Sequence, residues 1–298
     1  TPQLFNAIHA SIAGTRRYSG VSNLADYIST NRPARRILIA EDKPTNRDVI
    51  KLILEKAGHT VQTTEDGEGA LDALSTSRFD LAIIDFQMPK VSGLDVLQTY
   101  RFGADPIGTM PFLILTAHAT TEVREECESH GADAFLTKPV DPGSLLTVVD
   151  QLTRAPSGTP ALIQTSLGDQ QQSTLEPLVN ASLVQYLRQL QPAPTDLKRL
   201  FQGFKEDTIH DLATMQEAAS ARDLARFHEA AHGLKGSAGS IGAQRIETLA
   251  EEARTISDAA ELGAGLVLVK EIRAALAATE IAFYTSAGGI HHNNATNV

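Results

Sequence analysis

The sequence predicts a doubly wound parallel α/β domain followed by an all-α helical bundle. Two observations predict this arrangement. Within residues 34–154, five strand signals, most of them short apolar runs, alternate with five segments of helical periodicity. From residue 181 onward, only helical periodicity remains. We therefore expect one domain at 34–154 and a second domain at 181–285.

The apolar runs of the first domain are typical of strands in a parallel sheet. Residues 81–84 are apolar and lie between Asp80 and Asp85, which indicates a short strand that is buried on both faces. Pro44 suits the first turn of a helix, and Gly58 ends that helix. The predicted strands are 37–40, 60–63, 81–84, 112–115 and 134–136, and the predicted helices are 44–57, 67–74, a helix from about 94, 122–129 and 142–152.

The second domain repeats apolar residues at steps of about three and four, as packed helices do. One predicted helix carries Leu197, Leu200, Phe201, Phe204, Ile209, Leu212 and Met215. The next carries Leu224, Phe227, Ala231, Leu234, Ala238 and Ile241. A third is marked by Ile246, Leu249 and Ala253, and residues 266–283 form a fourth. These segments predict a helical bundle.

Three segments lie outside the two predicted domains. Residues 1–33 hold a short amphipathic helix at 4–8 followed by a linker. Residues 155–180 are small, polar and proline-containing, and we expect a flexible linker there. A linker of about 26 residues spans roughly 30 Å, so sites in the two domains can meet within one chain. Residues 286–298 are expected to be a disordered tail.

Composition restricts the class of function. The chain has 298 residues, 42% of them hydrophobic, and a net charge of −10. Nucleic-acid binding is disfavoured, because phosphate neutralisation needs clustered Lys and Arg. The single cysteine, Cys127, fits a reducing compartment, and no apolar run reaches the 18 residues of a membrane span. Because the chain starts at Thr1, we expect a cytoplasmic fragment of a longer parent; whether that parent is dimeric and bound to the inner membrane stays open.

Polar residues lie at or just after the ends of four of the predicted strands. Glu41 and Asp42 follow the first, Asp85 the third, Thr116 the fourth and Lys138 the fifth. Ligand sites of such sheets lie beyond the carboxyl ends of the strands, and Mg²⁺ relieves repulsion among clustered carboxylates. A hydroxyl and an ammonium suit the oxygens of a phosphoryl group. The set predicts an aspartyl-phosphate site, with a turn or helix-cap role for Asp85 as the alternative.

Residues 35–153 resemble a response-regulator receiver domain, which has a flavodoxin-like fold. The resemblance is carried by Glu41-Asp42, Asn46, Asp85-Phe86-Gln87-Met88-Pro89, Gly93, Thr116-Ala117 and Lys138-Pro139. It implies that Asp85 accepts a phosphoryl group and that Asp42, Asp85, the Gln87 carbonyl and, through water, Glu41 bind Mg²⁺. It also implies that Thr116 and Lys138 contact the phosphoryl oxygens and that the Lys138–Pro139 bond is cis. Phe135 occupies the position at which the family has an aromatic side chain that rotates when the domain switches state. A purely structural role in the core is an equal alternative.

A stripe in the second domain joins a histidine to glycines. His232, Lys235, Gly236 and Gly239 share one helix face, and Gly233 and Gly242 lie close by. A glycine inside a helix costs roughly 1 kcal/mol relative to alanine, so several together need a reason. We interpret them as room for another protein to approach the imidazole. A metal pair of His228 and His232 is disfavoured, because no carboxylate or thiol stands at a matching offset.

The run from His232 to Ala238, with Gly242-Ala243, resembles a histidine-containing phosphotransfer domain over residues 180–285. The resemblance implies that His232 is phosphorylated and that Lys235 steadies the phosphoryl group. The two domains together resemble the C-terminal part of a hybrid sensor histidine kinase. Their order is similar to that of quorum-sensing sensors for a diffusible fatty-acid signal. The implied partners are a histidine kinase core and a downstream response regulator.

Rival interpretations differ in what the site does. Gly263 to Lys270 resembles an ATP-lid motif, but the other kinase boxes are absent, so enzymatic activity of this chain stays open. One alternative is a receiver that only binds and sequesters a partner protein. Another is a haloacid-dehalogenase-like phosphohydrolase, which needs a second Asp where this chain has Gln87.

Overall fold

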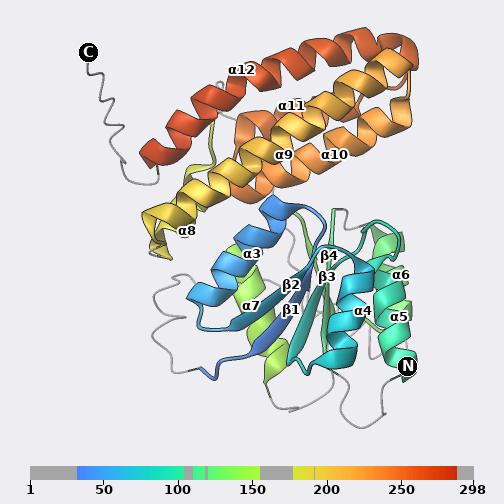
Figure 1. Ribbon diagram of the computed structural model, residues 1–298, viewed down its shortest axis with the longest axis vertical. Coiled ribbons are helices and arrows are strands. Elements are labelled where there is room, and N and C mark those ends of the chain that lie inside the picture. Colours follow the sequence, from blue (N-terminus) through green and yellow to red (C-terminus); the bar gives the residue numbers. More distant parts are fainter. Residues whose placement is uncertain (1–31, 104–109, 118–119, 155–176, 191, 287–298) are drawn as a thin grey trace, which may run out of the picture.

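The computed structural model describes residues 32–103, 110–117, 120–154, 177–190 and 192–286. The predicted N-terminal helix, most of the predicted linker and all but the first residue of the predicted tail therefore lie outside the described residues. Figure 1 shows a sheet with helices on both faces, and a helical bundle that packs against one of those helices, α3 (Pro44–Lys56). The predicted division into an α/β domain and an all-α bundle agrees with this arrangement.

The sheet has five parallel strands in the order β2-β1-β3-β4-β5. The strands are β1 (Arg36–Ala40), β2 (Thr60–Thr64), β3 (Leu81–Asp85), β4 (Phe112–Thr116) and β5 (Ala134–Thr137). All residues of β3 and β4 are buried, as the apolar runs predict, whereas the edge strand β2 is only half-buried. This order confirms the predicted flavodoxin-like fold, whose ligand site lies where the strand order reverses, next to β1 and β3.

Five helices cover the two faces of the sheet. In addition to α3, they are α4 (Gly67–Thr76), α5 (Gly93–Gly103), α6 (Thr121–Ser129) and α7 (Pro142–Thr153). Figure 1 shows α3 and α7 on one face and α4 and α5 on the other. Ile37 and Ile39 of β1 face one buried cluster, while Leu38 and Ala40 face the other, which is the two-residue alternation of a strand.

The bundle is built from five α-helices and a short 3₁₀ turn in the described part of the chain. They are α8 (Ala181–Gln189), α9 (Pro194–Ala221), α10 (Leu224–Ile241), α11 (Gln244–Arg254), η1 (Ala259–Glu261) and α12 (Leu262–Ser286). Gly265, within the segment that resembles an ATP lid, lies inside α12, where an added Cβ would be 2.6 Å from the Phe227 ring. That glycine therefore serves helix packing.

One residue of the predicted bundle core is misplaced. Ile209 is 46% exposed, whereas Thr208 and Asp211 of the same helix are buried. Thr208 and Asp211 lie four and seven residues after the buried Phe204, so they share its face of the helix. Ile209 lies five residues after Phe204 and therefore points away from that face. Thr208, a polar residue, therefore fills the core position, and the prediction that Ile209 belongs to the core is wrong.

The bundle packs along the α/β domain through α3 and α9. Three polar pairs join these elements: Lys43 with Asp211, Thr45 with Asp207, and Lys56 with Asp196. Residue numbers rise along α3 as they fall along α9, so the two helices run antiparallel. The larger hydrophobic cluster contains residues of both domains. The domains therefore share a packed interface and are not merely joined by a linker.

Among the helices that the structure describes, none combines the length and the apolar character needed to cross a membrane.

Candidate functional site

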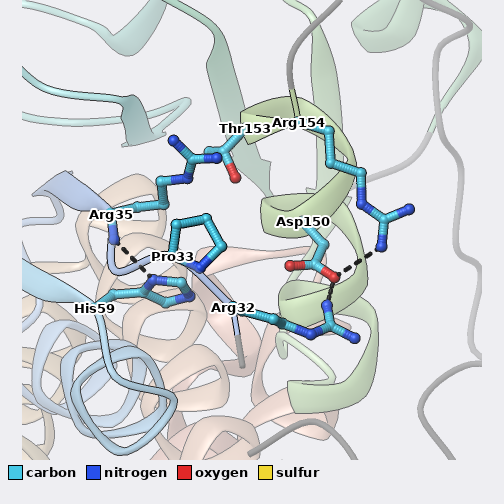
Figure 2. Close-up of a pocket in the computed structure, with 7 residues that line it drawn as sticks. All are labelled: Arg32, Pro33, Arg35, His59, Asp150, Thr153 and Arg154. Carbon is cyan, nitrogen blue, oxygen red and sulfur yellow. Dashed lines mark hydrogen bonds and ion pairs between the residues drawn. The ribbon is translucent and has the colours of Figure 1, made fainter. Parts of the chain in front are cut away.

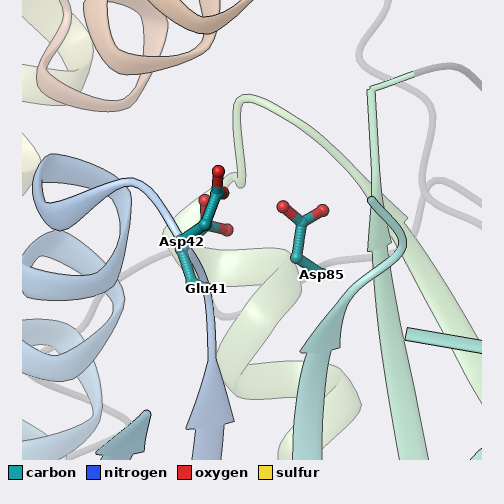
Figure 3. Close-up of side chains that lie close together, drawn as sticks. All are labelled: Glu41, Asp42 and Asp85. Atoms are coloured by element: carbon teal, nitrogen blue, oxygen red, sulfur yellow. The ribbon is translucent and has the colours of Figure 1, made fainter. Parts of the chain in front are cut away.

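Three carboxylates meet at the carboxyl ends of β1 and β3. Glu41 and Asp42 follow β1 and Asp85 ends β3, and each offers an oxygen within 4.8 Å of the others. Figure 3 shows Asp42 and Asp85 pointing toward the same space above the strand ends. Gly93 allows the chain to pass this point, because an added Cβ would overlap the carbonyl oxygen of Asp85.

Lys138 joins this cluster from the loop after β5. Its ammonium lies 2.7 Å from Oε2 of Glu41 and 2.8 Å from Oδ2 of Asp85. Burial alone would lower the pKa of Lys138, but the two carboxylates outweigh burial and raise it, so the side chain is charged. The Lys138–Pro139 peptide bond is cis, as the family resemblance implies. One lysine against three carboxylates leaves the cluster with a net negative charge when all are ionised.

Burial changes the acidity of the carboxylates. Burial, followed by the charge of Glu41, raises the pKa of Asp85 to about 7, although Lys138 opposes the change. The same two causes raise the pKa of Asp42 above its ordinary value. Neutralising these side chains with protons or with a cation therefore favours the folded cluster.

Thr116, Gln87 and Phe135 lie where the sequence places them. Thr116 is the last residue of β4 and is buried. The Gln87 backbone N–H donates to Oδ1 of Asp85 at 3.3 Å, which holds the loop against the carboxylate. Phe135 is buried in the smaller hydrophobic cluster, which both a core role and a switching role require, so both stay predictions.

The second predicted acceptor, His232, lies in the middle of α10. It faces the α/β domain across a cleft of about 1110 Å³, whose lining includes Asp42, Asp85 and Lys138 on one side and His232 and Gly236 on the other. The structure therefore brings the two predicted phosphoryl acceptors to one cavity, which sequence spacing could not show.

The glycines of α10 differ in what they contact. A Cβ at Gly239 would lie 3.1 Å from the ring carbons Cβ and Cγ of Pro139 and equally close to Oε1 of Glu247 in α11. A Cβ at Gly233 would lie 2.6 Å from the end of the Lys43 side chain. A Cβ at Gly236 would be 3.9 Å from Nδ2 of Asn46, an ordinary contact. All three glycines thus face the α/β domain, in agreement with the interpretation that they permit close approach.

Gly242 has a different role. Its φ of +77° is left-handed, and it ends α10 with its N–H bonded to carbonyls of the preceding turn. Such a helix C-terminus favours glycine for conformational reasons alone. The sequence interpretation, which grouped it with the other glycines, is wrong at this position.

Lys235 and His228 are engaged within the bundle. Nζ of Lys235 lies 3.1 Å from Oε2 of Glu251, and a ring nitrogen of His228 lies 2.8 Å from the carbonyl oxygen of Ile256. Glu41, Asp42 and Asp85 are the group of three or more acidic, His or Cys side chains that lie close enough together to hold a metal, among the described residues. The sequence-based expectation against a metal pair of His228 and His232 stays a prediction.

Sequence reasoning missed the residues that hold the domains together. Nζ of Lys43 lies 2.9 and 3.2 Å from the two oxygens of Asp211. The hydroxyl and the backbone N–H of Thr45 donate to Oδ2 of Asp207 at 2.5 and 3.1 Å. A signal was present: Asp207 and Asp211 lie one helical turn apart and three and seven residues after the buried Phe204, at core-facing positions.

A smaller pocket of about 90 Å³ lies at the opposite edge of the sheet (Figure 2). Asp150 pairs with Arg32 and Arg154, and the backbone N–H of Arg35 donates to Nδ1 of His59 at 3.3 Å. We assign no chemistry to it.

The raised pKa of Asp85 makes stability depend on pH. Between its ordinary value near 4 and about 7, the folded chain holds a proton on Asp85 that the unfolded chain has lost. Without divalent cations, the free energy of unfolding should therefore fall as pH rises through this window, by an amount on the order of a few kcal/mol. Asp85→Asn should abolish this part of the fall, and urea titrations from pH 5 to 8 in EDTA would measure it. Identical pH profiles for both proteins would contradict this account.

Comparisons with known proteins match each domain separately. Residues 37–150 match the response regulator receiver domain, and residues 199–281 match the Hpt domain. The chain is 30% identical over 224 residues to the sensory/regulatory protein RpfC of Xanthomonas campestris, covering 75% of this chain and 30% of that protein. It is 26% identical to the aerobic respiration control sensor protein ArcB of Escherichia coli, covering 74% and 28%. The chain thus spans less than a third of the length of these relatives.

The chain is also similar to solved structures of response regulators. The chemotaxis response regulator CheY4 of Vibrio cholerae is 29% identical, and the match covers 40% of this chain and 99% of that one, with a TM-score of 0.38.

Proposed function

The chain carries a response regulator receiver domain followed by an Hpt domain, the pair found in hybrid sensor kinases, and on this premise we propose that a phosphoryl group passes between Asp85 and His232 within it. Phosphorelay signalling is the function of such a pair. The observation that carries the residue-level proposal is the shared cleft: Asp85 and His232 line it from opposite domains.

The transfer is a displacement at phosphorus. A ring nitrogen of neutral His232 attacks the phosphorus of the Asp85 acyl phosphate, the bond from phosphorus to the carboxylate oxygen breaks, and the Asp85 carboxylate leaves with the electron pair. Lys138, already 2.8 Å from Oδ2 of Asp85, stabilises the negative charge on the departing oxygens. The reverse step uses the same residues, so the direction depends on which acceptor is loaded.

The acidic cluster fits a divalent cation. Three carboxylate oxygens within 4.8 Å, with one lysine to balance them, are an oxygen donor set of the kind that Mg²⁺ accepts. Asp42, Asp85 and the Gln87 carbonyl would hold the ion, with Glu41 acting through water. When bound, the ion neutralises negative charge on the phosphoryl oxygens. Thr116 and Lys138 are the side chains proposed to contact the remaining oxygens.

The partners follow from this chemistry. A histidine kinase core, in the same parent chain or another, would load Asp85, and a separate response regulator would receive the group from His232. Lys235 is proposed to bind the phosphoryl group on His232. To do so, its ammonium must leave Glu251, 3.1 Å away, and contact the phosphoryl oxygens instead. A fatty-acid quorum signal stays a prediction, because relatives with different names match at comparable identity.

The proposal is tested by loading the receiver with acetyl phosphate and Mg²⁺. The wild-type chain should form phosphohistidine at residue 232, detected by ³¹P NMR or by its acid lability. Asp85→Asn should form none, because acetyl phosphate donates to a carboxylate and the histidine is loaded only from it. Labelling of His232 in Asp85→Asn at the wild-type rate would show that the two residues do not exchange phosphate.

A further inference from the structure

We propose that two polar pairs across the domain interface, Lys43–Asp211 and Thr45–Asp207, determine which receiver domain can exchange phosphate with His232. This inference rests on the proposed function and adds the chemistry by which the partner is selected. We call these contacts the docking pairs. Each joins a residue at the start of α3 to an aspartate of α9.

Helix α3 lacks a side-chain cap of its own. Its N-cap residue, Lys43, makes no side-chain capping hydrogen bond, and the first turn contains no acidic residue. The N–H groups at a helix start need acceptors, and the helix dipole favours an anion there. Asp207 of the bundle supplies both, because its Oδ2 accepts from the Thr45 N–H at 3.1 Å. The bundle therefore completes a helix of the receiver.

The carboxylate of the Lys43–Asp211 pair is buried. The Asp211 side chain is only 4% exposed, and its two oxygens lie 2.9 and 3.2 Å from Nζ of Lys43. A buried carboxylate without a cation is strongly unfavourable. A receiver with an acidic or apolar residue in place of Lys43 would leave Asp211 buried and unpaired when it docks. Such a receiver is therefore rejected.

The docking pairs also lie next to the acidic cluster and to the helix turn that carries His232. Lys43 directly follows Asp42 of the acidic cluster, and its side chain crosses Gly233, the residue next to His232. A Cβ at Gly233 would lie 2.6 Å from Cε and Nζ of Lys43, so the glycine makes room for this lysine. The docking pairs thus fix the strand end that carries Asp42 against the helix turn that carries His232. Their loss should disturb the alignment of the two acceptors as well as affinity.

The partner that fits this surface is a second receiver with matching chemistry. It carries a cation directly after its acidic pair, and an uncapped helix start with a hydroxyl residue at the second helical position. The receiver of this chain meets both conditions through Lys43 and Thr45. We expect the regulator that accepts phosphate from His232 to meet them too.

A charge exchange tests the proposal. In the full chain, His232 is loaded with phosphoramidate, and transfer to Asp85 is followed by rapid quench at saturating Mg²⁺. Lys43→Asp and Asp211→Lys should each slow transfer at least tenfold, and the double variant should recover to within about threefold of wild type. Transfer should also be slower in Asp211→Asn, which removes the charge pair without introducing a repulsive charge. The matched control is Glu206→Lys on the same helix, where the side chain is exposed.

The outcomes separate the two proposals. If the wild-type chain shows no transfer between His232 and Asp85, the proposed function itself fails. If wild-type transfer is present and both single charge variants stay within twofold of it, the docking pairs do not select the partner. A double variant no faster than the slower single variant would also overturn the proposal, because paired charges would then not explain the loss.

Discussion

Replacing Lys138 with methionine is expected to slow phosphorylation of Asp85 by acetyl phosphate about 100-fold or more. The ammonium lies 2.8 Å from Asp85 and 2.7 Å from Glu41, where it can donate to a phosphoryl group as charge develops on its oxygens. Loss of one donor of this kind typically costs 10²–10³ in rate. Methionine keeps the length of the side chain and removes the charge. The measurement is the initial rate of labelling at saturating Mg²⁺.

The control for this prediction is Lys90→Met. Lys90 lies in the loop after β3, is exposed and pairs with Asp66 and Glu68, away from the cluster. The rate of Asp85 labelling in this variant should be within twofold of the wild-type rate. Circular dichroism must show both variants folded, because Glu41 is fully buried and loses its cation in Lys138→Met. If the folded Lys138→Met chain labelled within threefold of wild type, Lys138 would have no role in the reaction.

Gly239→Val is expected to slow transfer between His232 and Asp85 by about 100-fold while the bundle stays folded. A Cβ would lie 3.1 Å from the Pro139 ring, and valine adds two further methyl groups. A proline ring cannot rotate away, so α10 must move back from the loop that carries Lys138. Displacements near 1 Å cost about 10²-fold in such reactions. Valine is the better helix former, and the bundle side chain that lies close to the new Cβ is the end of Glu247 at 3.1 Å, a flexible carboxylate, so the bundle should stay folded.

The matched control is Gly203→Val on α9, where an added Cβ would meet no atom within 4 Å. It should transfer at the wild-type rate. Gly236→Val should fall between the two, because its Cβ would be 3.9 Å from Asn46, so that only the valine methyl groups approach the α/β domain. Transfer in Gly239→Val at the wild-type rate would show that close approach is not the reason for these glycines.

The receiver site was largely predictable from sequence for a physical reason. Parallel strands bring their carboxyl ends to one edge of the sheet, so residues such as Asp42, Asp85 and Lys138 become neighbours without any knowledge of packing. The helix stripe around His232 was also readable, since residues three and four apart share a face. Both predictions rest on local geometry and on topology, which the sequence pattern carries.

What the sequence could not show is the relation between the domains. The linker sets only a distance range, whereas docking depends on side chains such as Lys43 and Asp211, 168 residues apart in the chain. Lys235 was assigned to a phosphoryl group, and its contact with Glu251 depends on the packing of α10 against α11. The error at Ile209 has a different cause: a simple apolar count overlooks a core position that is filled by a polar residue, Thr208.

The central claim is that Asp85 and His232 exchange phosphate within one docked chain. The most direct test mixes an Asp85→Asn chain, loaded on His232 with phosphoramidate, with a His232→Gln chain that can accept only on Asp85. Transfer in the mixture should be slower than in wild type and should rise with concentration, while the wild-type rate should be independent of concentration. A tethered domain meets its partner at an effective concentration near millimolar, which the mixture cannot match. Equal rates in the mixture and in wild type at low micromolar concentration would contradict the docked arrangement and show that the relay runs between chains.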